Sequence, residues 1–244
     1  MLPWQNPAEF DGVMEGIDAF PAYIYRAKFG FNFDSMKDKI DRYLSCAQKI
    51  KEERNLSDPE EGNSTTGVHF NYDTEEGWDV PHNWEEFNEL FNFIEMVTPF
   101  LLDTWFGVQI PIPMSVGESW INVHRKGGST SAHHHQNACI SIVAYLNVPE
   151  NSGRFLVDNP LRPYKCSEPL APGSEDRMWG PIEVESGDIL FFPGWLTHKT
   201  EKSQTDEPRY VLSANLKTLP VHPAFKQWEY VGRKINTTDQ SVDS

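Results

Sequence analysis

In the stretch ACISIVAYLNV, residues 138–148, aliphatic residues recur at every second position, a pattern that predicts a β-strand. Successive side chains of a strand point to opposite faces, so this strand would present two different sides. One side would carry Ile140, Ile142, Ala144, Leu146 and Val148, and the other Cys139, Ser141, Val143, Tyr145 and Asn147. Strand signals on both sides of this stretch extend the β part of the fold.

Shorter strand signals, separated by turn residues, flank this stretch. We predict strands at 119–124, 154–157, 189–192 and 208–216, with turns at 126–128 and 149–153. Helical patterns come first in the chain and the strands follow, an order typical of α+β domains. The expected fold is therefore α+β with an all-β core, either a sandwich or a small barrel.

Two helices are predicted in the first third of the chain. From residue 35 to about 53, apolar residues recur at helical spacing: Met36, Ile40, Tyr43, Leu44, Ala47 and Ile50. The second helix is expected to begin near Asn83, which suits an N-cap, with Glu85 and Glu86 in its first turn. Its apolar stripe would consist of Phe87, Leu90, Phe91, Ile94, Val97, Leu101 and Trp105.

These elements fit one domain over residues 1–244. We expect a mainly helical part at 1–108, a β core at 109–218 and a C-terminal extension at 219–244. An acidic, Gly- and Asn-rich loop at about 55–83 separates the two helices. A loop of this length is either a functional lid or a solvated surface loop, and the sequence leaves both interpretations open.

Composition and charge limit the partners. Apolar residues make up 39% of the chain and aromatics 13%, a globular composition. The formal net charge of −15 argues against a nucleic-acid partner, which requires clustered Lys and Arg. No apolar run reaches the length of a membrane span and no signal peptide is evident. The three cysteines, Cys46, Cys139 and Cys166, are odd in number and well separated, which favours a reducing, cytoplasmic compartment.

Three consecutive histidines precede the central strand. In an extended segment His133 and His135 share a face and His134 opposes them. Two imidazoles two residues apart can reach one divalent ion, and nitrogen ligands suit iron, zinc, copper or nickel rather than calcium. A solvent-exposed polar run is the alternative.

Two further polar residues lie in apolar surroundings. His198 follows the run 187–193 and a short turn, and by itself it suits either a metal ligand or a hydrogen-bonded structural histidine. Arg209 shares a strand face with Val211, Ser213 and Asn215. A buried arginine requires an anion, which is either a ligand carboxylate or a protein carboxylate.

These residues together resemble a known family. Lys126-Gly127-Gly128, His133-x-His135 and the segment 142–147 resemble the core of Fe(II)/2-oxoglutarate-dependent oxygenases, most closely the prolyl-hydroxylase-like branch. Further elements of the resemblance are Trp120 and Asn122, Tyr145-Leu146, Asp158 to Pro160, GDILFFPGWLTH at 187–198, and the strand from Arg209 to Asn215. The resemblance covers about 119–216, with a weaker match at 20–25, and the ordered combination is more specific than any single element.

The resemblance implies a double-stranded β-helix, a jelly-roll or cupin-like barrel with the N-terminal helices packed outside. The enzyme would use Fe(II), 2-oxoglutarate and dioxygen to hydroxylate a primary substrate, either a peptidyl side chain or a small metabolite. His133, His135 and His198 would be the metal ligands. Arg209 would hold the distal carboxylate of 2-oxoglutarate, with Tyr145, Ser213 and Asn122 as further cosubstrate-binding residues.

One position departs from the family pattern. The second member of the first ligand pair is usually an acid, and here it is His135. A third imidazole leaves the centre one unit more positive. Asp158, Gln136 or Asn137 would be the alternative ligand, with Asp158 the most attractive because it is an acid.

Two other functions remain open at this point. One is a three-histidine cupin-type metal enzyme that does not use 2-oxoglutarate. The other is a non-catalytic β-sandwich binding module, for which His198 would lie far from His133. The surroundings of Arg209 separate the first alternative from the oxygenase: a protein acid beside it would favour the cupin type, and a metal-facing cavity would favour the cosubstrate.

Overall fold

The structure, a computed structural model, describes residues 24–53, 63–65, 80–108, 114–160, 179–218 and 234–235. Most of the expected acidic loop, Cys166 and almost all of the expected C-terminal extension lie outside these residues. Within the described part, no helix is both long and apolar enough to span a membrane.

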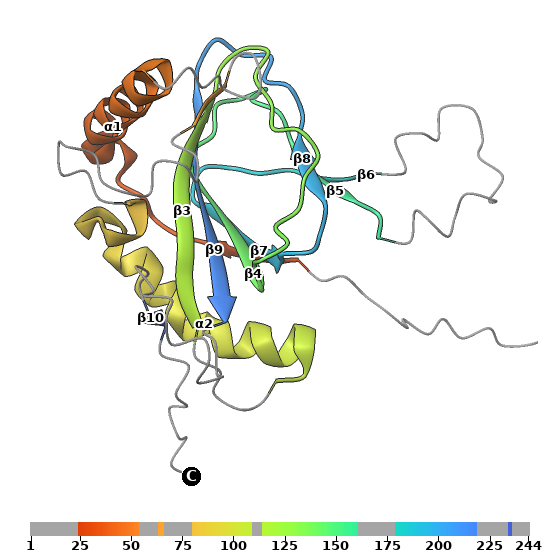
Figure 1. Cartoon of the computed structure of the whole chain (residues 1–244). Helices are drawn as coiled ribbons and strands as arrows, with labels where there is room; N and C mark the ends of the chain where they lie inside the picture. The colour runs from red at the N-terminus through yellow and green to blue at the C-terminus, as the bar shows by residue number, and fades with distance from the viewer. Residues whose placement is uncertain are drawn as a thin grey trace, which may run out of the picture.

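Two antiparallel sheets form the β part (Figure 1). The larger sheet has the order β1-β7-β4-β9-β3-β10, and β2 pairs with β3. Its strands are β1 (Tyr25–Lys28), β2 (Asn63–Thr65), β3 (Met114–His124), β4 (Ile140–Asn147), β7 (Asp188–Pro193), β9 (Arg209–Thr218) and β10 (Lys234–Ile235). The smaller sheet has the order β6-β5-β8, formed by Trp179–Ile182, Phe155–Asp158 and His198–Thr200.

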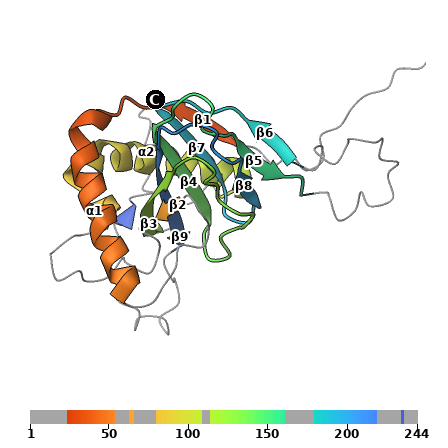
Figure 2. The same ribbon diagram turned by 90° about the horizontal axis from the view of Figure 1, so that it is seen from above.

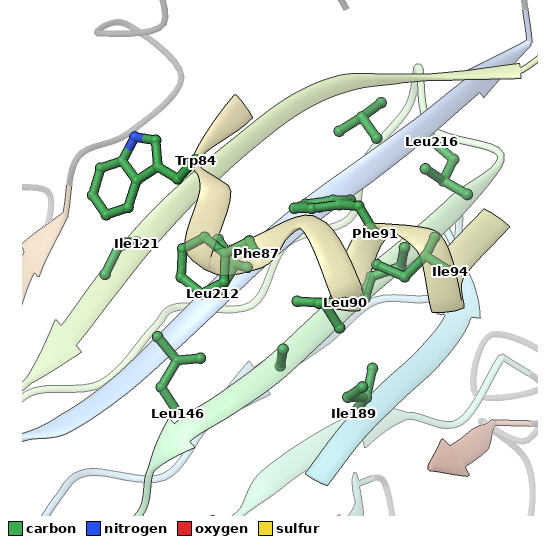
Figure 3. Packing of buried hydrophobic residues seen from close by; sticks show 14 of the residues in the cluster. Trp84, Phe87, Leu90, Phe91, Ile94, Ile121, Leu146, Ile189, Leu212 and Leu216 are labelled. Carbon is green, nitrogen blue, oxygen red and sulfur yellow. The ribbon is translucent and has the colours of Figure 1, made fainter. Parts of the chain in front are cut away.

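The helices and the smaller sheet lie on opposite sides of the larger sheet (Figures 1 and 2). Helices α1 (Phe33–Glu53) and α2 (Asn88–Phe106) contribute to one apolar cluster with the even-numbered residues of β4 and β9. Figure 3 shows Phe87, Leu90 and Ile94 of the helical layer against Leu146 and Leu212. Burial of these side chains is the main stabilising contribution at this face.

A second, smaller apolar cluster joins the two sheets. Val143, Tyr145 and Val211 from the larger sheet meet Phe155 of β5, together with Phe192 of β7. The odd-numbered side chains of β4 therefore point away from the helices, as its alternation predicts. The α+β class with antiparallel sheets is confirmed, and the strand faces follow the predicted parity.

The beginning of the second helix differs from the prediction. Two 3₁₀ turns, Pro81–Asn83 and Glu85–Phe87, come before α2, which begins only at Asn88. Trp84 is extended between the two turns, with φ −73° and ψ 137°, so one continuous helix cannot start at Asn83. The prediction of Asn83 as the N-cap is wrong, because the residue preceding α2 is Phe87, whose side chain makes no cap.

Two short strands lie inside the part predicted to be mainly helical. β1 pairs with β7, and Tyr25 lies opposite Phe191. β2 pairs with the end of β3, where Asn63 lies opposite His124. Both strands are too short to show a clear period, so pairing with the sheet rather than local pattern explains them.

Candidate metal centre and adjoining cavity

Three histidines from two separate segments meet at one point. His133 and His135 come from the segment before β4, and His198 is the first residue of β8. Each offers a ring nitrogen, and these atoms lie within 4.8 Å of one another. The ring centroids of His133 and His198 are 4.3 Å apart, and that of His135 is 5.0 Å from His133 and 5.3 Å from His198. The group can hold a transition-metal ion.

Backbone hydrogen bonds hold the two segments in register. His133 N donates to His198 O over 3.0 Å, and His198 N donates to His133 O over 2.9 Å. The amide of His135 donates to Gly194 O over 2.8 Å. Gly194 has to be glycine, because a Cβ there would collide with the carbonyl oxygen of Ala138. The close approach of these two loops positions His135 beside the other two rings.

In two of the three histidines, Nδ1 contacts a backbone carbonyl oxygen. Nδ1 of His133 lies 2.8 Å from Ser131 O, and Nδ1 of His198 lies 2.9 Å from Leu196 O. A carbonyl oxygen only accepts, so each Nδ1 carries the proton and donates it. The Nε2 atoms are then left with a lone pair, which is the form that binds a metal.

His135 has a different outer contact. Its Nδ1 lies 3.2 Å from the amide nitrogen of Asn215, which also donates to Glu118 Oε1 over 3.1 Å. The amide oxygen of Asn215 accepts from Ser141 Oγ over 2.8 Å, and Lys217 Nζ lies 3.1 Å from Glu118 Oε1. An amide N–H facing Nδ1 favours the proton on Nε2, so this contact prepares His135 for a metal less well than the carbonyls prepare the other two.

Burial keeps the imidazoles of His135 and His198 neutral. Burial, followed by the nearby imidazoles, lowers the pKa of His198 to about 3. Burial, and next the neighbouring His133, lowers the pKa of His135 to about 4. Both rings are therefore unprotonated at neutral pH, the state that metal binding requires.

A cavity of about 200 Å³ runs from the histidines to Arg209. It is smaller than sites for drug-sized molecules, so it suits a small ligand. Its lining comes from the larger sheet, the smaller sheet and the segment before β4: Trp120, Asn122, His124, Thr130, His133, His135, Ser141, Ile142, Val143, Tyr145, Phe155, Phe192, His198, Thr200, Arg209, Val211, Ser213 and Asn215.

The far end of this cavity carries a buried positive charge. Arg209 is 0% exposed; its Nη1 donates to Gly153 O over 2.6 Å and its Nη2 to His124 Nδ1 over 2.5 Å. No carboxylate of the described residues pairs with it. Its Nε and the hydroxyl of Tyr145 are buried, and neither has a hydrogen-bond partner among the described residues. Burial lowers the pKa of Arg209 and raises that of Tyr145. Two unpartnered donors in a buried site indicate a place for an anion.

The remaining predicted site residues lie at different positions relative to the metal-binding group. Asn122 and Ser213 line the cavity from the adjacent strands β3 and β9; Asn122 lies opposite Val211, and its Nδ2 is 3.5 Å from Ser213 Oγ. His134 is exposed. Asp158, at the end of β5, is not one of the residues in the metal-binding group, and Gln136 and Asn137 are exposed.

Three residues with a role around the site were not predicted from the sequence. Glu118 and Asn215 contact His135 as a network, and His124 supports Arg209. The alternation of 209–215 placed Asn215 on the same strand face as Arg209. It did not indicate their partners, because those depend on the pairing of β3 with β9.

Residues 118–215 match a family model described as "Putative 2OG-Fe(II) oxygenase". This segment contains all three histidines, Arg209 and Tyr145. The match confirms the resemblance inferred from the sequence, and the description names both predicted cofactors. No curated protein matches the chain.

Several solved structures are similar to the chain at low identity. A prolyl-4-hydroxylase from Pseudomonas putida is 12% identical, with a TM-score of 0.45 and coverage of 80% of this chain and 93% of its own. HygX from Streptomyces hygroscopicus, solved with nickel and 2-oxoglutarate, is 14% identical, with a TM-score of 0.43 and coverage of 87% and 92%. At these scores the likenesses carry no inference about this chain.

Proposed function

We propose that this chain, identified through residues 118–215 as a 2OG-Fe(II) oxygenase, hydroxylates its substrate at the three-histidine centre beside the buried Arg209. The chain is an oxidoreductase, and its cofactors are Fe(II) and 2-oxoglutarate. The observation that carries the proposal is the single cavity lined both by the three histidines and by an arginine without a carboxylate partner among the described residues.

The histidines fit iron. We assign His133, His135 and His198 as its ligands, supported by ring nitrogens within 4.8 Å of one another. His133 and His198 have the stronger support, because backbone carbonyls hold their Nδ1 protons. His135 requires the Asn215 amide to turn or move, so its share of the metal affinity is smaller. Asp158 remains the alternative third ligand.

The opposite end of the cavity fits the distal carboxylate of 2-oxoglutarate. Arg209 Nε and the Tyr145 hydroxyl are buried donors to which no described residue offers an acceptor. A carboxylate would accept from both, and a charge-assisted bond to Arg209 would offset the cost of burying the guanidinium. Ser213 and Asn122 lie along the wall between the two ends and would contact the bound cosubstrate.

Bound iron and the keto acid together supply the activation of dioxygen. The protein's part is to hold these groups in position and to exclude water. Val143, Phe155, Phe192 and Val211 form the apolar part of the cavity wall. A low-dielectric wall strengthens the attraction between Arg209 and a carboxylate. The primary substrate is a peptidyl side chain or a small metabolite.

We further propose that the two sheets form a double-stranded β-helix with the helices outside. The second apolar cluster, in which Val143 and Val211 meet Phe155, supports this arrangement because it lies between the sheets. A cytoplasmic setting is also proposed, and Cys139, a free cysteine among the described residues, is compatible with a reducing compartment.

The alternatives predict other geometry. The binding-module interpretation expects His198 far from His133, whereas the ring centroids are 4.3 Å apart. The three-histidine cupin interpretation expects a protein acid beside Arg209, whereas its partners are a carbonyl oxygen and an imidazole. Both observations favour the oxygenase.

Anaerobic titration of Fe(II) and 2-oxoglutarate into the metal-free protein tests this function. The visible charge-transfer band of an iron-bound keto acid should appear, and His198→Ala should abolish it. Tight, stoichiometric metal binding without a band would favour the cupin-type alternative.

A further inference from the structure

The chain contains two arginines that are bound in opposite ways. Arg154 lies on the outside and pairs with Glu201, with Nε–Oε2 2.8 Å and Nη2–Oε1 2.5 Å. Arg209 is buried, and both of its acceptors, Gly153 O and His124 Nδ1, are uncharged. The carboxylate of Glu201 neutralises the charge of Arg154. The contacts of Arg209 fix the position of its guanidinium but do not neutralise its positive charge.

His124 is itself held from its other side. Arg209 donates to Nδ1, so the ring proton is on Nε2 and is donated to Thr130 Oγ1 over 2.9 Å. The amide of Thr130 in turn donates to Thr200 Oγ1 over 2.8 Å. His124 is only 3% exposed, so neither contact competes freely with water. A chain of contacts thus connects β8 and the segment before β4 to the guanidinium.

We propose that His124 is a positioning residue that fixes Arg209 through a neutral acceptor, so that the guanidinium charge stays available to the distal carboxylate of the cosubstrate. This inference rests on the proposed function. A carboxylate at position 124 would hold Arg209 equally well, but it would also repel the ligand. The residue at this position therefore determines whether the cavity prefers a dicarboxylate.

The environment of His124 keeps its ring uncharged. Burial, and then the charge of Arg209, lowers its pKa to about 3. The described groups that face the ring are Arg209 and Thr130, neither of which favours a protonated imidazole. The geometry of the two contacts independently requires a ring with one donor and one acceptor.

An isosteric pair of variants separates charge from shape. His124→Asn places an amide acceptor near the position of Nδ1, and His124→Asp places a charged carboxylate there. Binding of 2-oxoglutarate and of 2-oxobutyrate, which lacks the distal carboxylate, is measured on the anaerobic Fe(II)-loaded proteins. His124→Phe, which offers no acceptor, is the third variant.

The two probes should respond differently. His124→Asn should keep 2-oxoglutarate affinity within about tenfold, the cost of losing the Thr130 contact. His124→Asp should lower it by about a hundredfold, because a like charge then faces the ligand. 2-Oxobutyrate should bind all three variants nearly as it binds the wild type. His124→Phe should no longer bind 2-oxoglutarate in preference to 2-oxobutyrate, whereas His124→Asn should keep this preference.

Equal affinities of the Asn and Asp variants for 2-oxoglutarate would overturn the inference. If the Asp variant does not fold, the comparison of Asn with Phe decides, and equal preference for the dicarboxylate in these two would overturn it. Failure of the wild type to bind 2-oxoglutarate would instead contradict the proposed function, so the two failures are distinguishable.

Discussion

The two faces of the larger sheet differ in chemistry although they come from the same strands. On β9, Leu212 and Leu216 pack into the helical layer, while Arg209, Ser213 and Asn215 line the cavity. One face is almost wholly apolar and the other holds charge and hydrogen-bonding groups. Alternation along one strand therefore separates the side chains that stabilise the fold from those that bind ligands.

The largest expected effect is the loss of metal on removing one of the three clustered histidines. His198→Ala should weaken Fe(II) or Co(II) binding by more than about a hundredfold, because losing an outer partner alone costs up to that much. Competition with a chelator of known affinity measures this change. His134→Ala is the matched control, since this neighbouring imidazole is exposed. Equal metal affinity of the His198 variant and the control would contradict the assignment.

The next largest effect is the loss of 2-oxoglutarate affinity on removing Arg209, from the cavity-lining face of β9. Arg209→Met should lower 2-oxoglutarate affinity by about a hundredfold, because a desolvated charged partner is lost, while metal affinity stays near wild type. Calorimetric titration of the metal-loaded protein measures both quantities.

Leu212→Ala is the control from the opposite face of the same strand. It should lower the free energy of unfolding by about 2–5 kcal/mol and leave 2-oxoglutarate affinity unchanged in the folded protein. A large loss of 2-oxoglutarate affinity in this variant would show that the two faces are not separable.

A smaller effect is the pH dependence of stability that comes from His124, on the cavity-lining face of the larger sheet. The folded-state pKa of His124 is about 3, below the ordinary 6.5, because burial and Arg209 disfavour its charged form. As pH falls below 6.5 the unfolded chain takes up a proton at this residue before the folded protein does. The contribution of the neutral His124 ring to the free energy of unfolding is thus complete above pH 6.5 and is lost progressively as the pH falls toward 3.

Urea unfolding of the metal-free protein at pH 7 and pH 5 measures this contribution. The wild type should lose up to about 2 kcal/mol more than His124→Asn between the two values, from 1.36 kcal/mol per pH unit below 6.5. The other histidines are present in both proteins, so the difference isolates His124. Parallel pH dependences would show that His124 is not shifted as described.

The smallest effect distinguishes the three histidines. His135→Ala should weaken metal binding by only about tenfold, because its outer contact is an amide nitrogen and not a carbonyl oxygen. Chelator competition alongside His133→Ala provides the comparison. A loss as large as that of the His133 variant would make His135 a full ligand and require the Asn215 amide to turn on metal binding.

The strong local patterns were predictable from the sequence. The alternation of 138–148 gives the two faces of β4, and helical spacing gives α1 from residue 33 to 53. The start of α2 was not predictable in the same way, because extended Trp84 separates Asn83 from the turn that carries Glu85 and Glu86, and α2 begins only at Asn88. Strand β1 carries only four residues and depends on its partner β7.

The site was predictable in its residues and not in its contacts. His133 and His135 stand out in a run of three histidines, and His198 and Arg209 stand out as polar residues in apolar surroundings. Their partners come from the three-dimensional pairing of distant segments, such as His124 with Arg209 across β3 and β9. No local pattern specifies that a neutral imidazole, and not an acid, faces the arginine.

A crystal structure of the protein grown anaerobically with Fe(II) and 2-oxoglutarate tests the central claim most directly. The account predicts iron bound to His133, His135 and His198 and the distal carboxylate at Arg209 Nε and the Tyr145 hydroxyl. Iron bound away from these histidines, or a 2-oxoglutarate carboxylate outside this cavity, would contradict it.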